Sequence, residues 1–238
     1  MPFRIVSLNI RHGGGRRAGQ IVDWLLTKQP SVLVLPEWRN NDAGLQIKSG
    51  LVNAGFRSVA TARTDSGVNG ILVATVEHTE YEKATPPDAA AAALLTVGPV
   101  QDLRLLGCYF PQRKAKAAFF KRCAQLADNN RDEPFVLIGD LNTGTNRLDI
   151  EGAGVRFDCA DLFESLSGKS NLVDLWRARH GDRQEWTWRS PVNGFRVDHC
   201  FANGVFINRF PNFECTIDHT PRLSGLTDHS AVILDVRL

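Results

Sequence analysis

Short apolar runs separated by polar stretches recur along the whole chain, and they predict strands that are buried on at least one face. Between the runs lie stretches whose apolar residues recur every three or four positions, which is the spacing of an amphipathic helix. This alternation indicates an α/β or mixed fold with helices on the outer faces. The predicted strands are 3–8, 32–35, 71–76, 103–109, 135–138, 195–201 and 231–236, and the predicted helices are 16–28 and 113–129.

The length of the chain and the continuity of this pattern predict one domain. At 238 residues the chain has a size that α/β and all-β folds commonly reach without splitting. A domain of this length buries roughly 70–75% of its extended-chain surface, which is enough for a core between two sheets. No linker or fixed-period repeat interrupts the pattern, so we expect a single domain over residues 1–238.

Composition narrows the location and the partners of the protein. The formal net charge is only +2, so binding of anions must come from local clusters rather than from an overall field. Five widely spaced cysteines form no CxxC pair and are typical of buried thiols in a reducing compartment. No segment approaches the roughly 18 apolar residues that a membrane-spanning helix needs. We therefore expect a cytoplasmic protein without a membrane span, and we take it to be a monomer.

One strand exit carries the clearest polar signal. The apolar run at 135–138 leads directly into Gly139, Asp140, Leu141 and Asn142. Strand side chains alternate between faces, which predicts that Asp140 and Asn142 point to the same side. A carboxylate and an amide held together at a sheet edge suit the positioning of a water or a phosphate. The alternative is a plain turn, because Gly, Asp and Asn all favour turns.

Polar residues also stand near the ends of the other predicted strands. Singly, each has a structural explanation, such as a loop residue, a turn cap, a core aromatic or, for Asp198, an ion pair with Arg196. Together they indicate a site, because functional residues collect on loops at one edge of a rigid sheet. Carboxylates and amides without a Cys or a His pair at zinc spacing suit Mg²⁺ or Mn²⁺, which points to phosphoester chemistry. The residues are Asn9, Glu37, Tyr109, Asp198, Asp228 and His229.

Six short motifs connect these positions to a known family. They are SLNI at 7–10, LPEW at 35–38, CYFPQ at 108–112, GDLN at 139–142, FRVDH at 195–199 and TDHS at 227–230. With these motifs in this order, the chain resembles the endonuclease/exonuclease/phosphatase superfamily, nearest to its exonuclease III-like (abasic-site) nucleases. The resemblance implies a DNase I-like fold, which is an α/β four-layer sandwich of two packed mixed β-sheets flanked by helices.

For the metal, the resemblance implies three residues. Glu37 is the main metal carboxylate, and Asn9 helps to bind the metal or the phosphate nearby. Asp228 supports a metal-bound water or a second ion. In such a site the ion neutralises phosphate charge and stabilises the leaving oxygen.

For the reaction, the resemblance implies five further residues. Asp140 aligns and deprotonates the attacking water, and Asn142 holds the scissile phosphate. His229 donates to a phosphate oxygen and is oriented by Asp198, while Tyr109 contacts the phosphate or assists the leaving group. These roles agree with general chemistry, because a carboxylate is a suitable base for water and a carboxylate behind a histidine fixes its tautomer.

Four residues bear on substrate binding, and two of them depart from the family pattern. Arg11 stands where many abasic-site nucleases carry Asn or Asp, so it meets a substrate phosphate or is simply solvated. Gln112 stands where an Asn often follows the proline. Trp188 and Phe195 predict an apolar wall against a sugar or base, with buried core as the alternative. The connection between these two aromatics is shorter than in the abasic-site enzymes.

The sequence therefore predicts a Mg²⁺- or Mn²⁺-dependent phosphodiester hydrolase that acts on DNA by direct attack of water. The basic residues at 113–122 support nucleic acid, although a charged helix face is also commonly just solvated. One alternative is an enzyme of the same superfamily that hydrolyses a small phosphoester, a lipid headgroup or RNA. Another is a scaffold of this fold that only binds a partner.

Overall fold

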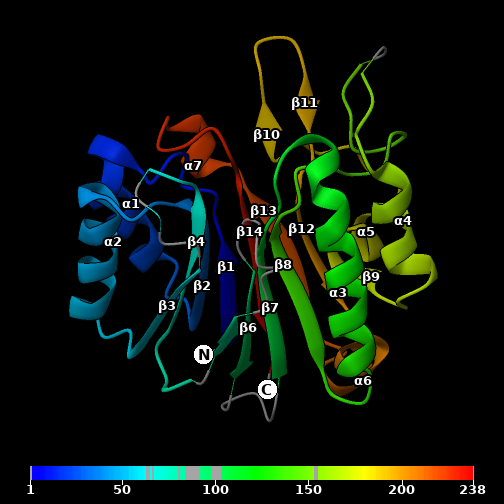
Figure 1. Cartoon of the computed structure of the whole chain (residues 1–238), viewed down its shortest axis with the longest axis horizontal. Helices are drawn as coiled ribbons and strands as arrows, with labels where there is room; N and C mark the ends of the chain where they lie inside the picture. The colour runs from blue at the N-terminus through cyan, green and yellow to red at the C-terminus, as the bar shows by residue number, and fades with distance from the viewer. Residues whose placement is uncertain are drawn as a thin grey trace.

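Two six-stranded sheets pack face to face at the centre of the folded molecule (Figure 1). The computed structural model describes residues 2–62, 65, 67–79, 81–83, 92–97, 103–152 and 155–237. In spatial order the first sheet contains β13 (Glu214–Asp218), β14 (Ala231–Val236), β1 (Phe3–Ser7), β2 (Val32–Trp38), β4 (Gly70–Thr75) and β3 (Ser58–Ala62). The second contains β5 (Tyr81–Lys83), β6 (Ala92–Val97), β7 (Leu103–Tyr109), β8 (Phe135–Asp140), β12 (Asp198–Ala202) and β9 (Val173–Asp174).

Helices cover both outer faces and complete four layers (Figure 1). The first sheet is covered by α1 (Ala18–Thr27) and α2 (Asp42–Asn53), and the second by α3 (Ala117–Asn129), α4 (Ala160–Gly168) and α5 (Leu175–His180). Two short helices, α6 (Gly204–Arg209) and α7 (Thr220–Leu223), lie before β13 and β14, and a hairpin of β10 (Trp188–Arg189) and β11 (Gly194–Phe195) projects from one end. Within the described ranges, no helix is long and apolar enough to cross a membrane.

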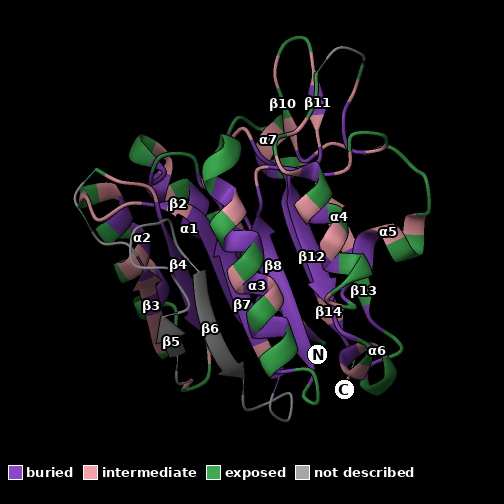
Figure 2. Cartoon of the chain, turned by 45° about the vertical axis from the view of Figure 1, so that its right-hand side comes forward, coloured by how far each residue is buried: buried purple, intermediate pink, exposed green. Residues whose placement is uncertain are grey.

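The core explains why the strands read as continuous apolar runs. In β2, Val32 and Val34 join the buried cluster between the two sheets, whereas Leu33 and Leu35 join a second cluster beneath α1 and α2. Both faces of the strand are therefore buried, and the outer surfaces of the helices carry the exposed residues (Figure 2). The sheets approach closely at Gly107 of β7, where an added Cβ would lie 3.1 Å from a methyl carbon of Val73 in the opposite sheet.

Most predicted elements are confirmed. The strands predicted at 103–109 and 231–236 have those bounds, and each predicted helix begins with a short 3-10 turn, at Gly15–Arg17 before α1 and at Arg113–Lys116 before α3. The strand predicted at 195–201 is wrong in part. It divides into β11 and β12, because the backbone N–H groups of Val197 and Asp198 donate to the side-chain oxygen of Thr187.

Arg196, at the break between β11 and β12, carries a buried guanidinium. Its Nε donates to Asp149 Oδ1 and its Nη2 donates to Asp174 Oδ2, each at 2.7 Å. Arg177 Nη2 also donates to Asp149 Oδ1, at 2.6 Å. The alternative pairing of Arg196 with Asp198 is therefore wrong. Arg196 lies in the break between the two strands, where strand alternation does not apply, and its side chain turns toward the loop that carries Asp149, so Asp198 is left for another partner.

Acid stability is expected to depend on this ion network. Burial alone would raise the pKa of Asp149 and of Asp174, but the Arg196 guanidinium, together with His199 and the hydrogen bonds to each carboxylate, holds both pKa values below their usual range. Above the unfolded pKa of about 4, such carboxylates make their full contribution to the free energy of unfolding. This contribution is lost as the pH falls from there toward the lower pKa of the folded state. We expect the free energy of unfolding, measured with urea, to fall below about pH 4, and Asp174→Asn to flatten this fall. The same steep fall in Asp174→Asn and the wild type would contradict the assignment.

Candidate active site

The polar residues predicted at the strand ends lie together at one edge of the two sheets. Strands β1 and β2 are parallel, as are β7 and β8, whereas β14 and β12 run antiparallel to β1 and β8. The ends of the parallel strands therefore meet the beginnings of the antiparallel ones. In the second sheet Asp140 is directly opposite both Tyr109 and Asp198. Strand topology thus explains how residues more than 100 positions apart come together.

Glu37 lies at a bulge in β2. The register with β4 shifts between Pro36 and Trp38, and the φ of Glu37 is 61°. The left-handed region is costly for a residue with a side chain, and such conformations collect at functional sites. The carboxylate is held from two sides, since Oε1 accepts from Asn9 Nδ2 at 3.2 Å and Oε2 accepts from the backbone N–H of His12 at 2.8 Å.

Asp140 and Asn142 lie side by side, although the physical reason is a turn and not the alternation of a strand. Strand β8 ends at Asp140, and Asn142 has a left-handed φ of 50°. The backbone N–H of Asn142 donates to Asp140 Oδ1 at 2.8 Å, and its Nδ2 donates to the backbone oxygen of Phe110 at 2.8 Å. Just before them, a Cβ on Gly139 would lie 2.0 Å from the backbone oxygen of Cys108, so only glycine fits. The segment is therefore a turn, and the turn is what places the Asn142 side chain beside Asp140.

Asp140 is buried and faces a second carboxylate. Asn9 Nδ2 donates to Asp140 Oδ2 at 2.9 Å, and Asp198 occupies the paired position on β12. Burial, followed by the negative charge of Asp198, raises the pKa of Asp140 to about 7. A base whose pKa lies near the working pH is well suited to exchange a proton with water.

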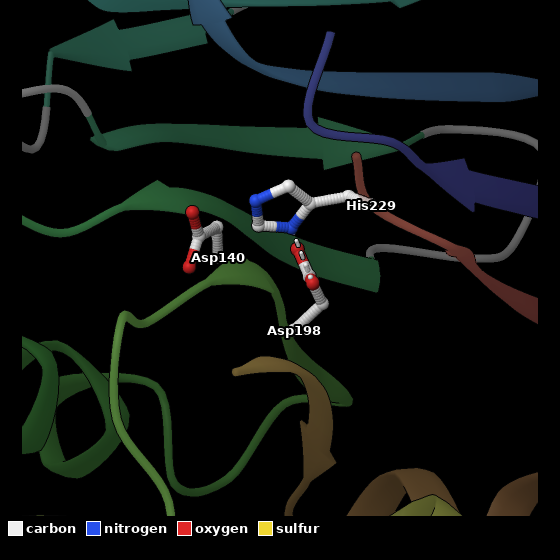
Figure 3. A group of neighbouring side chains, drawn as sticks. All are labelled: Asp140, Asp198 and His229. Carbon is white, nitrogen blue, oxygen red and sulfur yellow. Dashed lines mark hydrogen bonds and ion pairs between the residues drawn. The ribbon is translucent and has the colours of Figure 1, made fainter. Parts of the chain in front are cut away.

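Asp198 and His229 form a buried pair beside Asp140 (Figure 3). His229 Nδ1 lies 2.8 Å from Asp198 Oδ2, and the Asp198 side chain points directly at the ring. Burial lowers the pKa of His229, but the charge and hydrogen bond of Asp198, with the charges of Asp140 and Asp228, together raise the pKa to about 10. With Nδ1 held by Asp198, Nε2 remains as the donor for an anion in the cleft.

Tyr109 is held by two residues that the sequence did not single out. Asn69 Nδ2 donates to the Tyr109 hydroxyl at 3.2 Å, and Arg39 Nε donates to Asn69 Oδ1 at 2.6 Å. Burial, followed by the negative charge of Glu37, raises the pKa of Tyr109. The hydroxyl therefore keeps its proton at neutral pH and can act as a hydrogen-bond donor.

A cleft of about 340 Å³ opens above these residues. Asn142 and His229 face it, while Asn9, Tyr109, Asp140 and Asp198 lie behind its lining. The further predicted residues in its lining are Arg11, Glu37, Gln112, Trp188, Phe195 and Asp228. The structure therefore brings together all the residues predicted for the site.

The walls of the cleft combine aromatic and basic side chains. The Phe195 ring lies 5.7 Å from the Trp188 ring and 5.7 Å from the Phe157 ring, measured between centroids. Trp188 Nε1 donates to Asp228 Oδ2 at 3.1 Å, which connects the hairpin to the segment before β14. The basic lining residues besides Arg11 are Arg113, Lys116 and Arg156.

Lys116 shows what the sequence pattern could not reveal. It was grouped with the basic residues of a charged helix face, yet it is only 2% exposed. Its Nζ donates to the backbone oxygen of Asn142 and so supports the turn that carries Asp140.

The sequence prediction also missed His12 and Thr187. His12 Nδ1 lies 3.0 Å from Glu37 Oε2, and only its position three residues after Asn9 pointed to the site.

Among the described residues, Asp140, Asp198 and His229 form the one group of three whose ligand atoms lie within 4.8 Å of one another, as a metal site requires (Figure 3). The imidazole Nδ1 already bonds Asp198, which favours a proton-handling role for this group. Glu37 offers a separate carboxylate that is 14% exposed at the cleft. Its hard oxygen atoms fit a divalent cation such as Mg²⁺ or Mn²⁺.

Comparisons with known proteins identify the family and the fold. The chain matches the model of the Endonuclease/Exonuclease/phosphatase family over residues 6–229. It is similar to the structure of an AP endonuclease from Archaeoglobus fulgidus, with a TM-score of 0.81, 18% identity, and coverage of 99% of this chain and 100% of that chain. It is also similar to a 3'-5' exonuclease from Neisseria meningitidis, with a TM-score of 0.80, 18% identity, and coverage of 99% of this chain and 100% of that chain. An AP endonuclease from Leishmania major has a TM-score of 0.78 and 15% identity, with coverage of 100% of this chain and 88% of that chain. The predicted fold is confirmed.

Proposed function

Because the chain belongs to the endonuclease/exonuclease/phosphatase family, we propose that it is a single-domain, divalent-metal-dependent phosphodiester hydrolase whose substrate is DNA. One observation carries the proposal. Asp140 is buried between Asn9 and the Asp198–His229 pair, at the base of a cleft whose lining includes Glu37. A base, a hydrogen-bond donor and a metal carboxylate are thus gathered around one space.

Glu37 is the residue that would hold Mg²⁺ or Mn²⁺, with Asn9 beside it. Asn9 turns its Nδ2 to Glu37 and to Asp140 and its Oδ1 to the backbone N–H of Arg11, so its amide spaces the two carboxylates. When bound, the ion would neutralise phosphate charge and stabilise the leaving oxygen. Asp228, on the cleft wall, would support a water bound to the ion.

The proposed reaction is a direct attack of water on phosphorus. Asp140 orients the water and accepts its proton, and Asn142 holds the phosphate beside it. His229 donates from Nε2 to a phosphate oxygen as charge develops there, and Tyr109 contributes its hydroxyl to the phosphate or to the leaving group. No covalent intermediate is needed, because the water itself is the nucleophile.

DNA is the proposed substrate because the walls of the cleft suit a nucleotide. The exposed Arg113 and Arg156 would neutralise phosphates, and Gln112 and Arg11 would add polar contacts. Trp188 and Phe195 would pack against a sugar or a base. Two of the similar structures are of AP endonucleases, and another is a 3' phosphatase from Neisseria bound to product DNA hairpin. The five unpaired cysteines support a cytoplasmic location, and we propose that the protein acts as a monomer.

A small phosphoester or RNA is the second candidate. It is favoured by the net charge of only +2 and by the hairpin that closes with just four residues between β10 and β11. A scaffold that only binds a partner is disfavoured, because Asp140, Asp198 and His229 are all in place.

A substrate panel tests the proposal. Abasic-site duplex, plasmid, single-stranded RNA and a chromogenic phosphodiester are incubated with the protein in Mg²⁺ and again in EDTA. We expect cleavage of DNA that EDTA abolishes and that Glu37→Gln reduces by at least tenfold. Turnover of the chromogenic ester without any cleavage of DNA would replace DNA by the second candidate. Cleavage that persists in EDTA would contradict metal dependence.

A further inference from the structure

Arg11 places a fixed positive charge on the wall of the cleft beside Asp228. Arg11 Nε lies 3.6 Å from Asp228 Oδ2, and both residues line the cleft. Glu37 and His229 belong to the same lining. A carboxylate oxygen is also a ligand that a divalent ion takes, so a second ion at Asp228 would compete with this guanidinium.

The carboxylate of Asp228 is already surrounded by donors of the chain. Trp188 Nε1 donates to Oδ2 at 3.1 Å, and Thr227 Oγ1 lies 3.4 Å from Oδ1. Glu37 is also hydrogen-bonded, but by the amide of Asn9 and a backbone N–H, which carry no net charge. Its other neighbour is His12 Nδ1, 3.0 Å from Oε2, and this nitrogen accepts a hydrogen bond from Arg39 Nη2. A guanidinium next to Asp228 repels a further cation at the same oxygen, whereas the donors to Glu37 do not.

The backbone of Arg11 is held in place on both sides. Its N–H donates to Asn9 Oδ1 at 2.9 Å, and its carbonyl oxygen accepts from Arg17 Nη2 at 3.1 Å. Arg17 also donates to the backbone oxygen of Leu226, two residues before Asp228. The Arg11 side chain remains 54% exposed, so its outward N–H groups are available to a ligand.

We infer that Arg11 is a built-in cation that neutralises Asp228 in place of a second divalent ion and binds a substrate phosphate next to the scissile one. This inference rests on the proposed function and deepens it. The site would bind one divalent ion, at Glu37, and the charge of Asp228 would be balanced by Arg11. A guanidinium suits this role because it stays charged and can bond a carboxylate and a phosphate at the same time.

A titration with Mn²⁺ alone tests the first part, with bound ion measured from the loss of the free-ion paramagnetic resonance signal. We expect one ion per chain in the wild type and in Arg11→Lys, and two ions in Arg11→Asp, where two carboxylates would face each other. Arg156→Asp is the matched control, because it makes the same charge change in the same cleft and should keep one ion. Circular dichroism checks the fold, and Arg11→Ala replaces Arg11→Asp if that variant does not fold.

The outcomes separate the inference from the proposed function. Two ions in the wild type, or one ion in a folded Arg11→Asp, would overturn the inference and leave metal-dependent hydrolysis standing. One ion that persists in Glu37→Gln would overturn the metal assignment in the proposed function. No bound ion in the wild type would overturn both.

The salt dependence of DNA binding tests the second part. Binding is measured with Asp140→Asn, which keeps the cleft but is not expected to cut, and then with Arg11→Ala added. Loss of one phosphate contact should reduce the slope of log affinity against log salt by about 1. Arg131→Ala, before β8 at the opposite end of that strand, should leave the slope unchanged. An unchanged slope in Arg11→Ala would remove the phosphate contact from the inference.

Discussion

Asp140→Asn is expected to lower the turnover of the preferred substrate by about 10²–10⁴-fold, which is the range that a positioned general base contributes. The amide keeps the size of the side chain, and its single oxygen can accept one of the two hydrogen bonds that the carboxylate accepts from Asn9 and from the backbone N–H of Asn142. It cannot take a proton from water. Substrate affinity should therefore change little, and kcat should carry the loss, which steady-state kinetics at saturating metal will separate.

The same variant should be at least as stable as the wild type at pH 8. Asp140 is buried opposite Asp198, and removal of one of two facing carboxylates relieves their repulsion. Asp128→Asn, on the exposed end of α3, is the matched control and should change neither turnover nor melting temperature. If Asp140→Asn cut at more than a tenth of the wild-type rate, Asp140 would not be the base.

Arg196→Ala is expected to lower the free energy of unfolding by about 3–5 kcal/mol, because it leaves the buried Asp174 without its arginine and the buried Asp149 with Arg177 alone. The Arg196 side chain is 1% exposed, and those of Asp149 and Asp174 are 0% and 10% exposed. Urea denaturation at pH 7 measures the loss. Since the Arg196 side chain points away from Asp198, we expect the effect to appear as lost stability and not as a changed pH profile of the remaining activity.

An exposed pair provides the control for this second result. Arg147 Nη2 lies 3.1 Å from Asp182 Oδ2, with side chains 74% and 72% exposed. Its removal in Arg147→Ala should cost no more than about 1 kcal/mol. A loss below about 1 kcal/mol for Arg196→Ala as well would mean that water or a rearranged Arg177 compensates Asp149 and Asp174.

The elements that the sequence predicted well are those whose two faces are both apolar. Strands such as β7 and β14 are buried under helices on one side and under the other sheet on the opposite side, so an apolar run gives their bounds directly. The prediction of one strand over 195–201 was wrong in part, because the buried Arg196 lies at a break between two strands. Apolar periodicity contains no information about Thr187, whose side chain replaces a strand as the partner of two backbone N–H groups.

The candidate site was predictable where strand topology alone brings residues together. Tyr109, Asp140 and Asp198 follow from the ends of three neighbouring strands. Lys116, Asn69 and His12 were not predictable, because each reaches the site through a turn or loop whose path depends on tertiary contacts. The turn at Asn142 illustrates the limit, since its position beside Asp140 was expected for a reason that the structure replaces.

The bulge at Glu37 has a consequence for laboratory evolution. A left-handed backbone at a residue other than glycine costs about 1–3 kcal/mol, so Glu37→Gly would relax the chain at that point. Asp140→Asn would remove a second source of strain nearby. A screen of random variants for heat resistance alone should therefore enrich substitutions at these two positions, and the survivors should be inactive. A screen that requires both heat resistance and cleavage should leave both positions untouched and find its gains in the layers of helices.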